Sequence, residues 1–100
     1  MKYAIFDMDD TLCTLKHRRD AASTNGRHKV DFKILFDPKL VEYDLPEDHV
    51  VDLAETLSMF NTKIIVMTAR PYYMEEATIK WLNYHNIPFD QLITKEKNKV

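Results

Sequence analysis

The chain has 100 residues, of which 45% are apolar, and its 14 Lys or Arg and 16 Asp or Glu give a formal net charge of −2. This length and composition indicate one small globular domain, residues 1–100. No apolar run approaches the roughly 20 residues of a membrane-spanning helix, so we expect no membrane partner. The single cysteine, Cys13, excludes an internal disulfide and fits a reducing, cytoplasmic setting. The single glycine, Gly26, excludes a glycine-rich phosphate loop and therefore a P-loop kinase.

The first predicted element is a strand over residues 3–6, because a continuous apolar run is typical of a parallel strand covered on both faces. It is followed by Asp7, Asp9 and Asp10 and by the hydroxyl of Thr11. Open α/β sheets place their ligands at the carboxyl ends of strands, and carboxylates crowded there favour a bound cation or a shifted pKa. The alternative is an acidic turn in which Asp10 or Thr11 caps a helix.

Residues 13–45 form an insertion after the first strand and are the least regular part of the chain. We expect a turn at 23–26 and a short element at 33–36. Residues 16–33 contain six Lys or Arg and two Asp, a local charge of about +4. This basic segment either lies over the site and attracts a polyanion or forms a solvated loop.

The second half of the chain alternates helices and strands. A helix is predicted from the start signal at 44–47 to Phe60, then a strand ending in the segment 68–70, a helix over 72–86 and a short strand at 91–93. The apolar stripe of the first helix comprises Val50, Leu53, Ala54 and Leu57. This order implies right-handed crossovers, and so an α/β fold with a central parallel sheet and helices on both sides.

Both strand ends resemble motifs of the haloacid dehalogenase-like (HAD) superfamily of phosphohydrolases. Asp-x-Asp-x-Thr-Leu at 7–12 resembles the first motif. Thr68-Ala69-Arg70 resembles the second, in the form found in the phosphatase domains of phage-type polynucleotide kinase-phosphatases. The same branch is matched further on by Trp81, Leu82, His85, Ile87, Pro88, Phe89 and Asp90. The resemblance implies a three-layer α/β/α Rossmann-like fold with a small cap domain or none.

The resemblance also implies a mechanism, the hydrolysis of a phosphomonoester through an aspartyl-phosphate. Asp7 would be the nucleophile, and Asp9 the general acid and base. The Asp7 carboxylate and the backbone carbonyl of Asp9 would hold Mg²⁺, which prefers oxygen ligands. Thr68, Arg70 and Thr11 would bind the phosphoryl oxygens, the arginine through two parallel hydrogen bonds.

The substrate that the resemblance favours is a phosphorylated nucleic-acid end, especially a 3′-phosphate. The insertion has only about thirty residues, too few for a large cap, and an open site suits a bulky substrate. Arg18 and Arg19 of the basic segment are candidate substrate contacts. Two alternatives remain: a phosphatase of nucleotides or other small phosphoesters, and a non-catalytic nucleic-acid-binding domain that has kept the fold.

The pattern departs from the superfamily at the C-terminus. A neutralising lysine and a strand-end acidic pair that completes the Mg²⁺ site normally follow the segment equivalent to 92–94, and no acidic pair follows it here. A fragment of a longer protein, a short enzyme with an unusual metal site and an inactive remnant are the three explanations. A shortened sheet would expose an edge, which favours a homodimer or pairing with a missing C-terminal segment.

Overall fold

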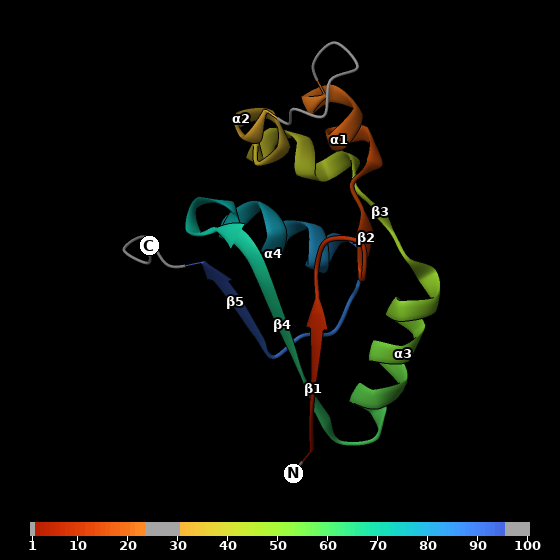
Figure 1. The fold of residues 1–100 in the computed structure, drawn as a ribbon. Coiled ribbons are helices and arrows are strands. Elements are labelled where there is room, and N and C mark those ends of the chain that lie inside the picture. The colour runs from red at the N-terminus through yellow and green to blue at the C-terminus, as the bar shows by residue number, and fades with distance from the viewer. Residues whose placement is uncertain (1, 24–30, 96–100) are drawn as a thin grey trace.

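The structure is a computed structural model that describes residues 2–23 and 31–95. Within these residues a parallel three-stranded sheet lies at the centre, in the order β1-β4-β5 (Figure 1). Phe6 pairs with Val66, and Val66 pairs with Leu92, so these three side chains share one face of the sheet. The strands are β1 Lys2–Asp7, β4 Thr62–Pro71 and β5 Gln91–Lys95.

Two helices connect the strands and pack on that same face. Helix α3, Asp48–Met59, precedes β4, and helix α4, Glu75–Tyr84, follows the 3₁₀ turn η2, Tyr72–Met74. Both crossovers step along the sheet in one direction, and right-handed crossovers then place both helices on one side. The core between this face and the helices includes Phe6, Ile64, Val66, Val51, Ala54, Trp81 and Leu82.

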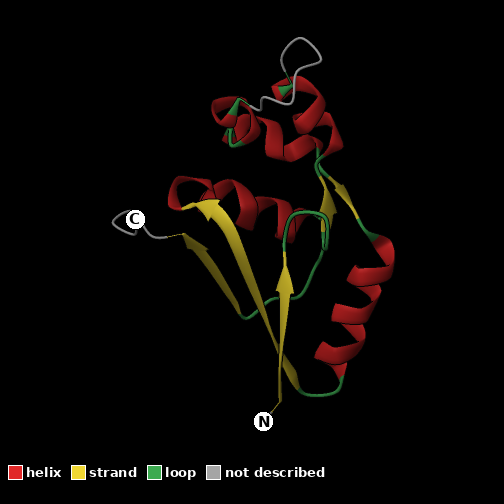
Figure 2. Cartoon of the chain, in the orientation of Figure 1, coloured by secondary structure: helices red, strands yellow, loops and turns green. Residues whose placement is uncertain are grey.

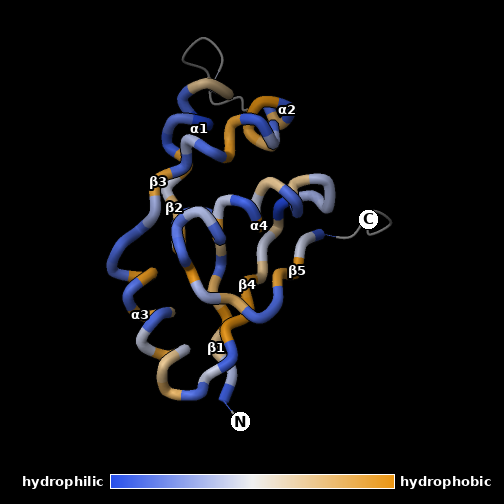
Figure 3. Tube along the Cα trace, turned by 180° about the vertical axis from the view of Figure 1, so that it is seen from behind, coloured by the Kyte–Doolittle hydropathy of each residue, from blue (hydrophilic) through white to orange (hydrophobic). Residues whose placement is uncertain are grey.

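The opposite face of the sheet is open in the described residues. Tyr3 and Ile5 of β1 are 62% and 64% exposed, and Met67 of β4 is 45% exposed. The expectation that the first strand is covered on both faces is therefore wrong, because α3 and α4 cover only one. Figure 3 shows that β1 and β4 are hydrophobic along much of their length. The predicted fold class, α/β with a central parallel sheet, is confirmed, and the arrangement is consistent with a Rossmann-like fold, with α3 and α4 packed on one face of the sheet in the described residues.

The insertion leaves and rejoins the sheet domain through one short ribbon. Strand β2, Cys13–Thr14, pairs antiparallel with β3, Leu45–Pro46, so the chain returns to where it departed. The helical elements between them gather beyond the carboxyl ends of β1 and β4 (Figure 2). The predicted turn at 23–26 lies, apart from Ser23, outside the described residues. The elements are α1 Lys16–Ala22, α2 Phe32–Leu35 and η1 Pro38–Tyr43.

The first predicted helix starts later than expected. Leu45 and Pro46 pair with β2 instead of opening α3, which begins at Asp48. Leu53 and Phe60 are 52% and 74% exposed, so the buried stripe is narrower than predicted. The buried residues of α3 are Val51 and Ala54, with Val50 and Leu57 packed against the core. In residues 2–23 and 31–95 no helix is both long enough and apolar enough to cross a membrane.

Candidate active site

The acidic loop after β1 folds into a tight turn around one carbonyl oxygen. The backbone N–H groups of Thr11, Leu12 and Cys13 all donate to the carbonyl of Met8, at 3.3, 3.0 and 3.1 Å. Asp10 has a positive φ of 63°, which a short polar residue tolerates. Met8, Leu12 and Cys13 are completely buried, so the turn is anchored in the core. Its carboxylates therefore project from a turn whose apolar residues belong to the core.

Asp7 and Asp9 have different surroundings. Asp7 is exposed at the end of β1, and its Oδ1 accepts the backbone N–H of Met8 at 2.7 Å. The Asp9 side chain is 25% exposed, and its Oδ1 accepts from Arg70 Nε at 3.0 Å and from Arg70 Nη2 at 2.6 Å. The Asp7 carboxylate is thus exposed at the strand end, whereas the Asp9 carboxylate is held by an arginine.

Arg70 lies at the end of β4 and is completely buried. Besides Asp9, it contacts Thr78 of α4, whose Oγ1 accepts from Nη1 at 2.8 Å. Burial by itself lowers the pKa of Arg70, but the hydrogen bond and charge of Asp9 outweigh it and raise the pKa. The guanidinium predicted to bind phosphate is therefore occupied by the protein's own groups. Phosphate binding by Arg70 stays a prediction.

A second buried pair adjoins the first. Arg18 of α1 donates from Nε to Asp44 Oδ1 at 2.9 Å and from Nη2 to Asp44 Oδ2 at 2.8 Å. Arg70 Nη2 also donates to Asp44 Oδ2 at 3.1 Å, and Arg18 Nη2 lies 3.5 Å from Asp9 Oδ1. The positive charges of two guanidinium groups are therefore balanced by the negative charges of two carboxylates in one network. Buried charges are tolerated only when they are paired in this way.

Asp44 is the member of this network that the motifs did not indicate. It follows η1, and its carboxylate is completely buried. Its backbone carbonyl accepts the indole N–H of Trp81 at 2.9 Å. His17 Nε2 lies 3.3 Å from Asp44 Oδ1. In the sequence, Asp44 is recognisable only as part of a helix start signal, and no motif or spacing relates it to Asp9.

Cys13 lies beside the network as a small, completely buried residue. Its Sγ is 3.5 Å from the Met8 carbonyl, 3.8 Å from Asp9 Oδ1 and 3.9 Å from Asp44 Oδ2. Burial raises the pKa of the Cys13 thiol from 9.0 to about 12. The thiol is therefore protonated at neutral pH and is a poor nucleophile or metal ligand.

Asp9, Cys13 and Asp44 place three groups of metal-binding type within 4.8 Å of one another. The two carboxylates are already paired with Arg18 and Arg70, and an entering cation would have to displace both guanidinium groups. This cluster is better explained as an ionic network than as a metal site. The exposed carboxylate of Asp7 is a more suitable donor, because Mg²⁺ takes one or two protein carboxylates and completes its shell with water and substrate phosphate.

The remaining predicted residues divide into surface and interior. Thr11 is half-buried, and Thr68 is 7% exposed, with its Oγ1 accepting the backbone N–H of Arg70 at 3.2 Å. Arg19 is about half exposed and pairs with Asp10. Arg18, predicted as a substrate contact, is instead completely buried against Asp44. Of the two arginines, only Arg19 is placed to meet a ligand at the surface.

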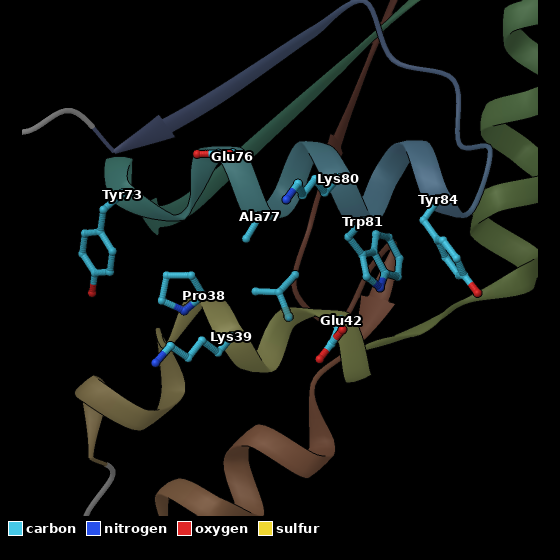
Figure 4. A pocket seen from close by; sticks show the side chains of 10 residues that line it. Pro38, Lys39, Glu42, Tyr73, Glu76, Ala77, Lys80, Trp81 and Tyr84 are labelled. Atoms are coloured by element: carbon cyan, nitrogen blue, oxygen red, sulfur yellow. The ribbon is translucent and has the colours of Figure 1, made fainter.

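A groove of about 840 Å³ lies between η1 and α4, away from the acidic loop (Figure 4). Tyr73, Trp81 and Tyr84 line it together with Lys39 and Glu42. It contains none of the predicted catalytic or phosphate-binding residues. Trp81 links the groove to the network through its hydrogen bond to Asp44.

The fold and the site together define a Rossmann-like α/β domain with two carboxylates at the end of its first strand. No family model matches the sequence, and no curated protein matches it. A chain in the "Structure of Pnkp1/Rnl/Hen1 complex" has a TM-score of 0.72 at 22% identity, covering 98% of this chain and 29% of that chain. A chain in the "Structure of the Pnkp1/Rnl/Hen1 RNA repair complex" has a TM-score of 0.71 at 22% identity, with coverages of 98% and 27%.

A crystal structure of an MCSG target from Vibrio cholerae has a TM-score of 0.60 at 21% identity, covering 94% of this chain and 69% of that chain. The chain spans less than a third of the length of the two Pnkp1/Rnl/Hen1 chains that it matches. At these identities the likeness shows a shared fold.

Proposed function

We propose that this domain hydrolyses phosphomonoesters at nucleic-acid ends, with Asp7 as the nucleophile and Asp9 as the general acid and base. The observation that carries the proposal is the contrast between the two carboxylates. Asp7 is exposed, and no ion pair in residues 2–23 and 31–95 involves it, which suits a nucleophile, whereas Asp9 is held by Arg70. The fold shared with a chain of an RNA repair complex supports a nucleic-acid end as the substrate.

The proposed reaction has two displacements at phosphorus. A carboxylate oxygen of Asp7 attacks phosphorus, the bond to the ester oxygen breaks, and Asp9 donates a proton to the departing oxygen. Water then attacks the aspartyl-phosphate, Asp9 takes its proton, and the Asp7–phosphorus bond breaks to release inorganic phosphate. Asp9 thereby regains the proton that it gave to the departing oxygen, so protons and bonds balance over the cycle.

Mg²⁺ is the cofactor that fits this reaction, held by the Asp7 carboxylate and the backbone carbonyl of Asp9. When bound, it offsets the repulsion between an anionic nucleophile and a phosphate dianion. Thr68 and Thr11 contribute hydroxyl groups toward the phosphoryl oxygens. Because Thr68 Oγ1 accepts a backbone N–H, its own hydrogen is left to be donated.

The test is phosphate release from a 3′-phosphorylated oligonucleotide, with and without Mg²⁺. We expect Mg²⁺-dependent release that Asp7→Asn abolishes. Asp48→Asn, which changes an acid in the first turn of α3, serves as the matched control and should retain activity. Release that persists in Asp7→Asn would contradict the proposal.

Two further results would favour the alternatives. Efficient turnover of mononucleotides, with no gain from longer oligonucleotides, would indicate a small-phosphoester phosphatase. Oligonucleotide binding without any hydrolysis, unchanged by Asp7→Asn, would indicate a binding domain. Binding insensitive to salt would exclude the basic segment as a surface that follows phosphates.

A further inference from the structure

The two oxygens of the Asp9 carboxylate are bound unequally. Oδ1 accepts from Arg70 Nε and Nη2 at 3.0 and 2.6 Å and lies 3.5 Å from Arg18 Nη2. Within the described residues, the donor recorded for Oδ2 is Arg70 Nε, at the longer distance of 3.4 Å. Oδ2 is therefore the oxygen best placed to hold and transfer a proton.

Asp44 helps to fix where the two guanidinium groups point, alongside the Leu35 carbonyl, which accepts from Arg18 Nη1, and Thr78 Oγ1, which accepts from Arg70 Nη1. Its Oδ1 and Oδ2 take two donors of Arg18, and Oδ2 also takes Nη2 of Arg70. Asp44 is itself fixed by the indole of Trp81 at its backbone carbonyl. Without the Asp44 charge, both cations would have Asp9 as their one carboxylate partner in the network, and their released donors would turn toward Asp9 Oδ2.

We infer that Asp44 is a positioning residue for the general acid, acting through Arg18 and Arg70 to keep Asp9 Oδ2 less engaged than Oδ1 and available for proton transfer. The inference rests on the proposed function. It also gives the insertion a part in the chemistry, because Arg18 in α1 and Asp44 after η1 both belong to it.

The test compares two substrates that differ in their need for a general acid. The 3′-oxygen of an oligonucleotide departs as an alkoxide and needs a proton. The leaving group of p-nitrophenyl phosphate is a stable phenolate and needs little help from a general acid. Single-turnover release of each leaving group reports the first displacement alone. For Asp44→Asn we expect a loss of about 100-fold with the oligonucleotide, the lower end of general acid catalysis, and a loss of a few-fold with the aryl ester.

The ratio of the two rates is independent of how much of the variant is folded, since both substrates report on the same folded molecules. Asp90→Asn is the matched control: Asp90 accepts the backbone N–H of Ile64 at 2.7 Å, outside the network, and its loss should leave the ratio unchanged. Asp44→Glu keeps the charge but displaces it by one methylene, and it is tested in the same way should Asp44→Asn fail to fold.

Equal losses on both substrates in the Asp44 variants would overturn the inference and leave the proposed function standing. A wild-type chain that releases neither leaving group would overturn the proposed function, and the inference with it. A selective loss with the oligonucleotide, together with an unchanged KM for it, would establish the positioning role.

Discussion

Arg70 Nη2 lies 2.6 Å from Asp9 Oδ1, so an arginine at the end of β4 holds the proposed general acid at the end of β1. The same guanidinium reaches Thr78 on α4 through Nη1. One side chain thus joins the loop after β1, the end of β4 and the helix behind the sheet. The stability of the fold at this point and the orientation of Asp9 therefore depend on the same Arg70 contacts.

Removing the Arg70 charge should strongly destabilise the fold. Arg70→Met keeps an unbranched apolar stem but leaves Arg18 as the one arginine in the described residues that pairs with Asp9 and Asp44, and breaking a buried ion pair in this way costs about 3–5 kcal/mol. Urea unfolding measures the change. The control is Arg19→Met, whose pair with Asp10 is about half exposed and whose loss should cost less than about 1 kcal/mol. Similar small losses in both variants would contradict a tightly coupled network.

The Thr78 hydroxyl should matter to stability in a way that an ordinary helical threonine does not. Thr78→Val keeps the shape but leaves a buried guanidinium donor unpaired, a loss of about 1.5–3 kcal/mol for a hydrogen bond to a charged group. Thr56→Val is the matched control, because Thr56 is an exposed threonine of α3 whose hydroxyl donates to the backbone carbonyl of Asp52. We expect its unfolding free energy to stay near that of the wild type. A Thr78→Val protein as stable as Thr56→Val would mean that water replaces the hydroxyl.

The strands and their motif ends could be predicted because apolar runs and the residues that end them are local signals. The motifs led us to expect Arg70 near the end of β1, and it contacts Asp9 there. They did not indicate that a carboxylate would be its partner, since an arginine binds phosphate and carboxylate through the same two-pronged geometry. Asp44 could not be found, because its contacts with Arg18 and Trp81 join distant parts of the chain without periodicity. For a similar reason Leu45 was read as part of a helix start, whereas pairing with Thr14 makes it a strand.

The two faces of the sheet should respond differently to the same substitution. Ile64 on β4 is completely buried against the helices, whereas Ile5 on β1 is 64% exposed on the open face. Ile64→Ala should lower the free energy of unfolding by about 2–5 kcal/mol, the usual cost of such a cavity. Ile5→Ala should cost less than about 1 kcal/mol, since most of its surface already meets solvent. If Ile5→Ala proves as costly as Ile64→Ala in urea unfolding, a second copy or another segment covers the open face.

Cys13 should make the stability of the fold fall at alkaline pH. Below pH 9.0 the Cys13 thiol is protonated in both the folded and the unfolded chain, so its titration takes nothing from the free energy of unfolding. Between pH 9.0 and about 12 the unfolded chain loses the proton and the folded chain keeps it, which favours unfolding as the pH rises.

The comparison with Cys13→Ala isolates this effect, because the alanine variant lacks the titrating group and keeps every other one. We expect the difference in unfolding free energy between the wild type and Cys13→Ala to shift against the wild type by about 1.4 kcal/mol between pH 8 and pH 10. Urea unfolding of both proteins at the two pH values measures the shift. A difference that stays constant would mean that the folded chain releases the Cys13 proton as readily as the unfolded chain does.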